Sequence, residues 1–445
     1  MGDTTTAGAT ERLGTRDLLW SGTRTSIVLG PLDLPPHEDL VAAAGALAEA
    51  FPAARLGQAL DASRGRWVAA GLPVAQLARR AVLVHDGPGP DEVGLSAFAR
   101  ALEAHRTDDV PVRWVVAGRH LALLICHAAG DGGLMLGLPA ALLEVARTGR
   151  PPAWTQQPDL TSPLLRALAH HYGRHPRRVA LTLAAVRAAA AASSATSTGA
   201  GGGGEQDDDA GRALLRPSTT AVHAVMGEAQ LAELTAWRRA QGKGTSGVAV
   251  QTVLVGAALA AVGLPPQGPP TVLVDARRYL PPGAAVHGNF VAGLQLPVGE
   301  RWDAREITTA LRSAVEAARP LSAMTLGAAR QLLPRTRAAR TATGERVPAR
   351  PRPVLAVTSM QHPALADLPW DGPAARATAT SVSTPAPAEG VTASLTELRG
   401  HLNLSLSFHG AVYDTARMAE AVRLATGDPV AVLERAASRR AEVLA

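Results

Sequence analysis

Residues 121–137 read LALLICHAAGDGGLMLG, and this stretch decides how the chain is expected to fold. Its first six residues form a continuous apolar run with the length of a buried strand. Small loop residues follow, and an apolar segment then extends to about Arg147 with the length of a helix. Pro139 either starts that helix or kinks it. The stretch therefore predicts a strand, a tight loop and a helix in direct succession.

The loop carries one histidine, His127, followed by Asp131 and Gly132 in the pattern His-x-x-x-Asp-Gly. Composition alone produces a pattern this short in on the order of a tenth of chains of this length, so the pattern needs support from its context. That context is favourable, because His127 ends a buried strand and residues 128–130 are Ala, Ala and Gly. Such small residues let a substrate approach the imidazole closely. We therefore interpret His127 as a functional residue and not as a histidine of the core.

The 445 residues exceed what one hydrophobic core usually organises, so two lobes are expected. Residues 188–215 contain an Ala and Ser run, four successive glycines and an acidic run, which is the composition of a flexible linker. No lysine follows the glycines with the spacing of a phosphate-binding loop. The sequence predicts an N-terminal lobe over 1–187 that carries the His127 motif, and a C-terminal lobe over 216–445.

Strand and helix patterns are mixed on both sides of this linker, which predicts α/β lobes with mixed sheets. In the first lobe we expect strands at 24–29, 113–117 and 121–126 and a helix at 38–50. In the second lobe we expect strands at 221–226, 271–275, 292–298, 353–359 and 402–408. Helices are expected there at 228–241, 248–262 and 304–318, and from about 415 onward.

Composition excludes several classes of function. The net charge of +6 is spread over scattered arginines with a single lysine, Lys243, and aromatic residues are few, so a nucleic-acid partner is not expected. Cys126 is the only cysteine, which excludes an internal disulfide and a cysteine-cluster metal site. No His-Glu-x-x-His spacing occurs either, so no metal site is predicted.

Hydropathy predicts no integral membrane segment and no secretory signal. The longest apolar stretch, 248–264, is of marginal length for a bilayer and contains Gln251, Thr252 and two glycines, which suits a buried helix better. The first seventeen residues are polar and lack an apolar core of the signal-peptide type. We expect a cytoplasmic protein.

At the His127 motif the chain resembles the acyltransferase superfamily that includes peptide-synthetase condensation domains, chloramphenicol acetyltransferases and wax ester synthases. The resemblance covers most of the chain: residues 274–280, VDARRYL, are similar to its Asp-x-Arg segment, and 288–291, GNFV, to its Gly-Asn-Phe segment. Residues 354–360 and 402–414 resemble its late core strands. The bacterial condensation-type and wax-ester-type members are most similar, since the Asp-Phe-Gly-Trp-Gly motif of plant alcohol acyltransferases is missing.

The resemblance implies two similar α/β lobes with a tunnel between them and His127 at its midpoint. It implies acyl transfer from a thioester, acyl-CoA or an acyl or peptidyl carrier protein, to a small-molecule alcohol or amine. Neutral His127 would act as general base, and donors in the site would stabilise the oxyanion. No cofactor is bound permanently in this interpretation, because coenzyme A or the phosphopantetheine thioester serves as co-substrate.

The resemblance also implies roles for the residues around His127. Asp131 and Gly132 would support the site, with Arg277 as the cationic partner of Asp131 and Arg278 as the alternative. Cys126 stands where many relatives have a first histidine. Cys126, Gly130, Asn289 and Ser359 are candidates for positions near the substrate, although a strand-end turn for Asn289 and a core strand for Ser359 are equally open.

Two other functions compete with acyl transfer. A serine hydrolase would use related chemistry, but no Gly-x-Ser-x-Gly elbow is present. A catalytically inactive relative that binds a carrier protein or an acyl chain is the stronger alternative, because Cys126 replaces the first histidine. Acyl transfer that depends on His127 would separate the two interpretations.

Overall fold

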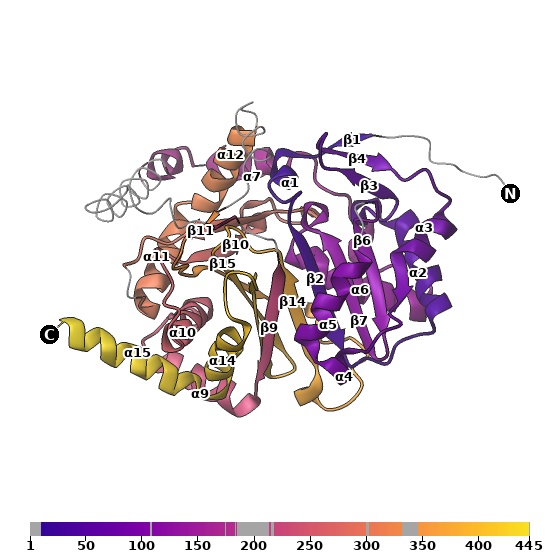
Figure 1. The fold of residues 1–445 in the computed structure, drawn as a ribbon. Helices are drawn as coiled ribbons and strands as arrows, with labels where there is room; N and C mark the ends of the chain where they lie inside the picture. Colours follow the sequence, from indigo (N-terminus) through magenta and orange to yellow (C-terminus); the bar gives the residue numbers. More distant parts are fainter. Residues whose placement is uncertain are drawn as a thin grey trace.

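The computed structural model describes residues 10–106, 109–173, 175–182, 184, 213–214, 218–299, 302–331 and 346–444. Figure 1 shows two lobes side by side, each built on its own sheet with helices packed against it. The predicted fold class, α/β with mixed sheets in two lobes, is confirmed. Most of the predicted linker over 188–215 lies outside the described residues.

The elements of the first lobe come from the N-terminal part of the chain. Its strands are β1 (Glu11–Arg12), β2 (Arg24–Gly30), β3 (Gln58–Asp61), β4 (Arg66–Ala69), β5 (Val82–Val84), β6 (Val112–Ala117) and β7 (His120–Cys126). Its helices are α1 (Thr15–Leu18), α2 (His37–Ala50), α3 (Val74–Ala81), α4 (Pro90–Val93), α5 (Leu95–Ala101) and α6 (Gly132–Thr148), and α7 (Pro163–Gly173) leads toward the second lobe.

The remaining elements belong to the second half of the chain. The strands are β8 (Ala213–Leu214), β9 (Thr219–Met226), β10 (Thr271–Asp275), β11 (Val291–Gln295), β12 (Arg346–Val347), β13 (Val354–Met360), β14 (Thr378–Ser383), β15 (Gly390–Leu398) and β16 (His401–His409). The helices are α9 (Glu228–Ala240), α10 (Gly247–Ala261), α11 (Ala304–Glu316), α12 (Arg319–Gln331), α14 (Thr415–Gly427) and α15 (Pro429–Leu444).

Strand β7 lies at the centre of the first lobe, in a five-stranded sheet of order β14-β2-β7-β6-β5. It pairs antiparallel with β2 and β6, and all seven of its residues are buried. That position explains the continuous apolar run, since a central strand covered on both faces has no polar side. A short 3-10 turn, η3 (His127–Ala129), follows the strand, and α6 begins at Gly132. Pro139 lies inside α6, so the interpretation of Pro139 as its start is wrong.

The second lobe is built on a six-stranded sheet of order β11-β10-β13-β15-β16-β9. Strand β13 runs parallel to both β10 and β15, whereas the other neighbours are antiparallel. Helices α10 and α14 pack on this sheet, and α10 supplies a long apolar face to its core. Most of the apolar stretch 248–264 therefore lies in a core helix of this lobe, α10, which ends at Ala261. Among the described helices, none has both the length and the apolar character to cross a membrane.

One strand of the second half of the chain crosses to the first lobe. Strand β14 pairs antiparallel with β2 and thereby extends the sheet that contains β7 (Figure 1). The predicted lobe boundaries at 187 and 216 assign β14 to the C-terminal lobe, whereas its pairing places it in the sheet of the first lobe. The two lobes are therefore connected by strand pairing as well as by the contact between their surfaces.

The edge of β14 that does not pair with β2 forms hydrogen bonds with side chains of β16 in the second lobe. Backbone amides of Ala379, Ser381 and Ser383 donate to Asn403 Oδ1 (3.1 Å), Ser405 Oγ (3.4 Å) and Ser407 Oγ (3.1 Å), respectively. Each pair is separated by 24 residues, so the two strands keep a constant register. Buried polar side chains thus replace a strand partner at this edge.

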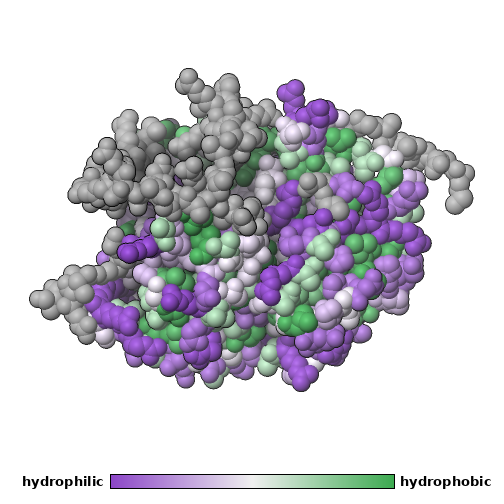
Figure 2. Space-filling model, viewed as in Figure 1, coloured by the Kyte–Doolittle hydropathy of each residue, from purple (hydrophilic) through white to green (hydrophobic). Residues whose placement is uncertain are grey.

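The strands and helices predicted from patterning are all present, with bounds that differ by up to three residues. The elements that were not predicted are the helices α1, α3, α4, α5, α7 and α12 and the strands β1, β3, β4, β5, β8, β12, β14 and β15. The single final helix expected from about 415 onward is two helices, α14 and α15. Figure 2 shows hydrophilic and hydrophobic residues alternating over the visible described surface, which is ordinary for a folded chain.

We expect Ser407→Ala to lower the free energy of unfolding by about 1 kcal/mol, because it leaves the partly buried Ser383 amide without its acceptor. The exposed Ser438 in α15 is a matched control, and Ser438→Ala should change stability by less than about 0.5 kcal/mol. Chemical denaturation of both variants checks this. Equal stability of the two variants would show that the bonds between β14 and β16 contribute nothing.

Candidate active site

A cavity of about 520 Å³ lies between the lobes, and His127 is in its wall. The first lobe contributes Trp20, Thr25 and the start of α6, and the second lobe contributes β10, β11 and β13. The lining of the cavity is also rich in hydroxyl groups, which come from Thr358, Ser359, Ser381, Ser383, Thr384, Thr392 and Ser394. The volume lies in the range of small-molecule sites.

Asn289 fixes which ring nitrogen of His127 carries the proton. Its Oδ1 lies 3.0 Å from His127 Nδ1, and its Nδ2 donates to the carbonyl oxygen of His127 (2.7 Å) and to Asp17 Oδ1 (3.2 Å). Two oxygen acceptors around Nδ2 determine the orientation of the amide, because Oδ1 in that place would meet only acceptors. Oδ1 can only accept, so Nδ1 of His127 is the protonated nitrogen. Nε2 is left with its lone pair.

Trp20 fixes the plane of the imidazole. The two ring centroids lie 4.3 Å apart and the planes differ by 15°, which is a stacked arrangement. Trp20 follows α1, the short helix that also carries Asp17. This short segment near the N-terminus therefore supports His127 in two ways. Trp20 stacks on the face of the ring, and Asp17 binds Asn289, which in turn contacts Nδ1.

Burial lowers the pKa of His127 below its ordinary value of 6.5. A contact with its own main chain, the charge of Asp131 and the bond with Asn289 act in the opposite direction but do not outweigh burial. The imidazole is therefore neutral at neutral pH. A neutral ring with Nδ1 protonated presents Nε2 as a base.

The Asp131 carboxylate holds the loop after β7 against the second lobe. It is 1% exposed and receives four bonds. Arg277 donates from Nη1 (2.8 Å) and Nη2 (3.3 Å), and the backbone amides of Phe290 (2.9 Å) and Gly133 (3.2 Å) donate as well. Asp131 is the N-cap of α6 through the Gly133 bond, so one carboxylate starts the helix and joins the lobes.

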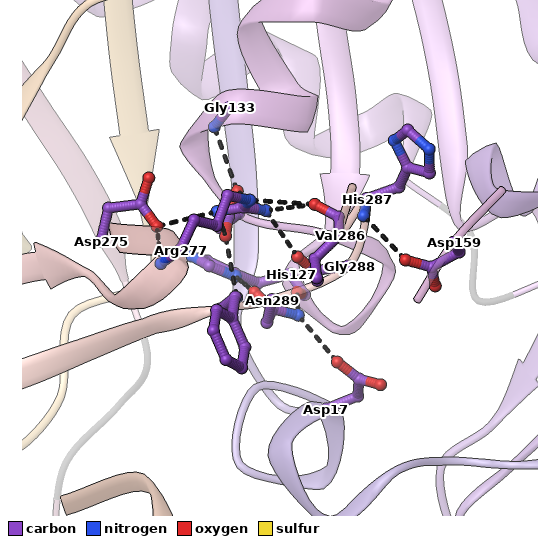
Figure 3. A network of polar contacts seen from close by, with 12 residues as sticks. Asp17, His127, Gly133, Asp159, Asp275, Arg277, Val286, His287, Gly288 and Asn289 are labelled. Carbon is purple, nitrogen blue, oxygen red and sulfur yellow. Dashed lines mark hydrogen bonds and ion pairs between the residues drawn. The ribbon is translucent and has the colours of Figure 1, made fainter. Parts of the chain in front are cut away.

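Arg277 is the cationic partner of Asp131, and Arg278 is not. The guanidinium also donates to the carbonyl oxygens of Val286 and Gly288, which orients the loop that presents Asn289 (Figure 3). Burial lowers the pKa of Arg277, but Asp131 and Asp275 outweigh it and raise the pKa overall. Arg277 therefore links Asp131 in one lobe to the Asn289 loop in the other.

The remaining candidate residues fall into two groups. Gly132 and Ser359 line the cavity with His127, whereas Cys126 and Gly130 are not in its wall. Asn289 is also outside the cavity wall, and it contacts the Nδ1 atom of His127. Gly130 has a packing role, because a Cβ there would lie 2.3 Å from Leu134 Cδ2.

Cys126 faces away from the cavity of His127. Its thiol is buried, accepts from Arg24 Nη1 at 3.2 Å, and lines a separate small cavity of about 20 Å³. The expectation that Cys126 lies near the substrate is therefore not met, since the side chain before His127 on an extended strand points to the opposite face.

Trp20 and Asp17 were missed at the level of sequence. Both lie before β2, in a segment without strong periodicity, and nothing in their spacing connects them to residue 127 or 289. In the part of the chain that the structure describes, no group of three or more His, Cys, Asp or Glu residues could hold a metal ion.

No family model and no curated protein sequence matches the chain, but solved structures do. Polyketide synthase associated protein 5 from Mycobacterium tuberculosis is similar at 17% identity and a TM-score of 0.55, over 95% of this chain and 99% of its own. Trichothecene 15-O-acetyltransferase from Fusarium sporotrichioides shares 12% identity at a TM-score of 0.56, with 98% and 97% covered.

The SgcC5 protein from Streptomyces globisporus, solved with (R)-(-)-1-(2-naphthyl)-1,2-ethanediol and sucrose, is also similar. It shares 16% identity at a TM-score of 0.56, with 96% of this chain and 99% of that one covered. Coverage of 95% or more of both chains at low identity shows a common fold. The chain therefore shares the fold of these solved structures, in agreement with the two-lobed fold that the resemblance implied.

We expect Asp131→Asn to cost about 3 kcal/mol of stability, because its amide nitrogen would face the donors of Arg277 and Phe290. Arg277→Ala should cost a similar amount, and the double variant should cost clearly less than the sum of both. Thermal and chemical unfolding of the three variants checks this. Additive effects would mean that the pair does not join the lobes.

Proposed function

We propose that this protein is an acyltransferase that moves an acyl group from a thioester, on coenzyme A or on a carrier protein, to a hydroxyl or amine acceptor. The observation that carries the proposal is the state of His127: its Nδ1 is held by Asn289 and its neutral ring lies in the wall of a cavity between two lobes. A fixed neutral imidazole with one free nitrogen is suited to general-base catalysis.

The reaction needs one base and no covalent intermediate with the enzyme. His127 Nε2 takes the proton of the acceptor while the acceptor oxygen or nitrogen bonds to the thioester carbonyl carbon. The tetrahedral oxyanion then collapses, the carbon–sulfur bond breaks, and the imidazolium returns the proton to the leaving thiolate. Hydroxyl groups of the second lobe, such as those of Ser359 and Ser394, are the candidate donors to the oxyanion.

Similarity to solved structures supports the class of reaction. One neighbour is named as a 15-O-acetyltransferase and another as a polyketide synthase associated protein, and both share the fold over nearly their whole length. Cys126 in place of a first histidine does not count against catalysis, because its thiol lies outside the cavity. The burial of Cys126 also argues against a thiol nucleophile.

We expect His127→Ala to lower the rate of acyl transfer at least roughly 100-fold while the fold is kept, since general bases contribute on that scale. Cys126→Ser is the matched control beside it in sequence and should stay within a few-fold of the parent. An intact-mass assay that crosses acyl-CoA and acyl-carrier donors with small alcohols and amines measures both. A His127→Ala rate close to the parent, or loss of activity with thiol acylation at Cys126, would contradict the mechanism.

We expect the pH profile of kcat/KM to show an acid limb with a midpoint below 6.5. Burial lowers the pKa of His127, so the ring stays neutral and active until the pH falls below that lowered value. Rates between about pH 5 and pH 8 with one donor and one acceptor give the midpoint. An acid limb above 6.5 would mean that the base is another group or that the site stabilises the imidazolium.

A further inference from the structure

The floor of the His127 cavity is one face of the ribbon formed by β10 and β11. The two strands are antiparallel, with Thr271 opposite Gln295, Leu273 opposite Gly293 and Asp275 opposite Val291. Because side chains alternate along a strand, these six residues share one face, and all six line the cavity. Of the intervening residues, Val272, Val274 and Leu294 are packed in the core of the second lobe, and Ala292 belongs to a smaller cluster with Leu321 of α12.

A second cavity, of about 900 Å³, adjoins the His127 cavity at the Thr271 end of this ribbon and continues under α7 and α12. The two cavities share Thr271, Gly293 and Gln295, which all belong to the face of the ribbon that lines the His127 cavity. Leu294 of β11, the edge strand of the sheet, also lines the second cavity. Two residue steps, from the Leu273–Gly293 pair to the Thr271–Gln295 pair, give the shared floor a length of roughly 7 Å.

The second cavity is mostly apolar. Its walls include Leu168 and Tyr172 from α7, Val179 beyond it, and Ala323 and Leu326 from α12. Leu326 is 49% exposed and lines this cavity, so its side chain is accessible to a ligand there. Gly293 lies in the middle of the floor of the His127 cavity and also lines the second cavity, and it has no side chain to block passage between the two.

We propose that this apolar cavity takes an aliphatic acyl chain of the thioester donor, an inference that rests on the proposed function. The acyl carbonyl must lie at His127, and the chain that extends from it then runs along the ribbon toward α12. The pantetheine arm of the donor, which carries the thiol, must then extend from His127 to the other side of the site. There a third cavity, of about 360 Å³, meets the first at Gly133 and Arg277 and presents polar side chains, among them Gln157 and His362, to the amides of a pantetheine arm.

The test measures binding of acetyl-, octanoyl- and lauroyl-N-acetylcysteamine thioesters by calorimetry. These probes carry the end of the arm common to coenzyme A and carrier proteins, so only the chain changes. Each buried methylene strengthens binding up to about 4-fold, and octanoyl should bind at least roughly tenfold more tightly than acetyl. Leu326→Glu should reduce the lauroyl to acetyl preference at least roughly tenfold, and Ala323→Trp should reduce it by filling the cavity.

Leu165→Glu is the matched control, since Leu165 is 66% exposed on α7 and does not line the cavity. Its chain-length preference should equal that of the parent. Lauroyl binding no more tightly than acetyl, or equal preferences in Leu326→Glu and Leu165→Glu, would overturn the inference. A preference that appears with alkyl alcohols and not with acyl thioesters would also overturn it.

The outcome is separable from that of the proposed function, because binding requires no turnover. His127→Ala should keep the chain-length preference of the parent. If the parent transfers no acyl group but binds long chains selectively, the proposed function fails and the assignment of the apolar cavity stands.

Discussion

The active arrangement depends on one buried carboxylate. Asp131 lies between the lobes, where it starts α6, pairs with Arg277 and accepts the amide of Phe290. Four donors compensate for its removal from water, and an isolated carboxylate in this place would be too costly to keep charged. Because those donors come from both lobes, the position of the loop after β7 and the position of the Asn289 loop are determined together.

The state of His127 follows from this constraint. Arg277 orients the carbonyl groups of Val286 and Gly288, and the next residue, Asn289, then reaches the imidazole and its main chain. Trp20 on the ring face limits rotation, so the ring is held at an edge and at a face. Asn289 thus connects the structural role of Asp131 to the chemical role of His127.

The sequence predicted the parts of this site that are local. A strand, a tight loop and a helix around His127 follow from an apolar run, small residues and a second apolar run, and all three are present. The Asp131 and Arg277 pair came from resemblance to a family, because 146 residues separate the partners. Trp20, Asp17 and the crossing of β14 to the first lobe depend on tertiary packing between distant segments, which periodicity does not record.

The central claim is that burial keeps His127 neutral and that Asn289 places its proton on Nδ1, which leaves the lone pair on Nε2. Nitrogen NMR of protein labelled in the histidine rings tests it directly, with the His127 signals assigned by their loss in His127→Ala. At pH 7 we predict a protonated Nδ1 and an unprotonated Nε2, and replacement of Asn289 by Leu should remove this preference. A ring protonated on Nε2, or on both nitrogens, would contradict the account.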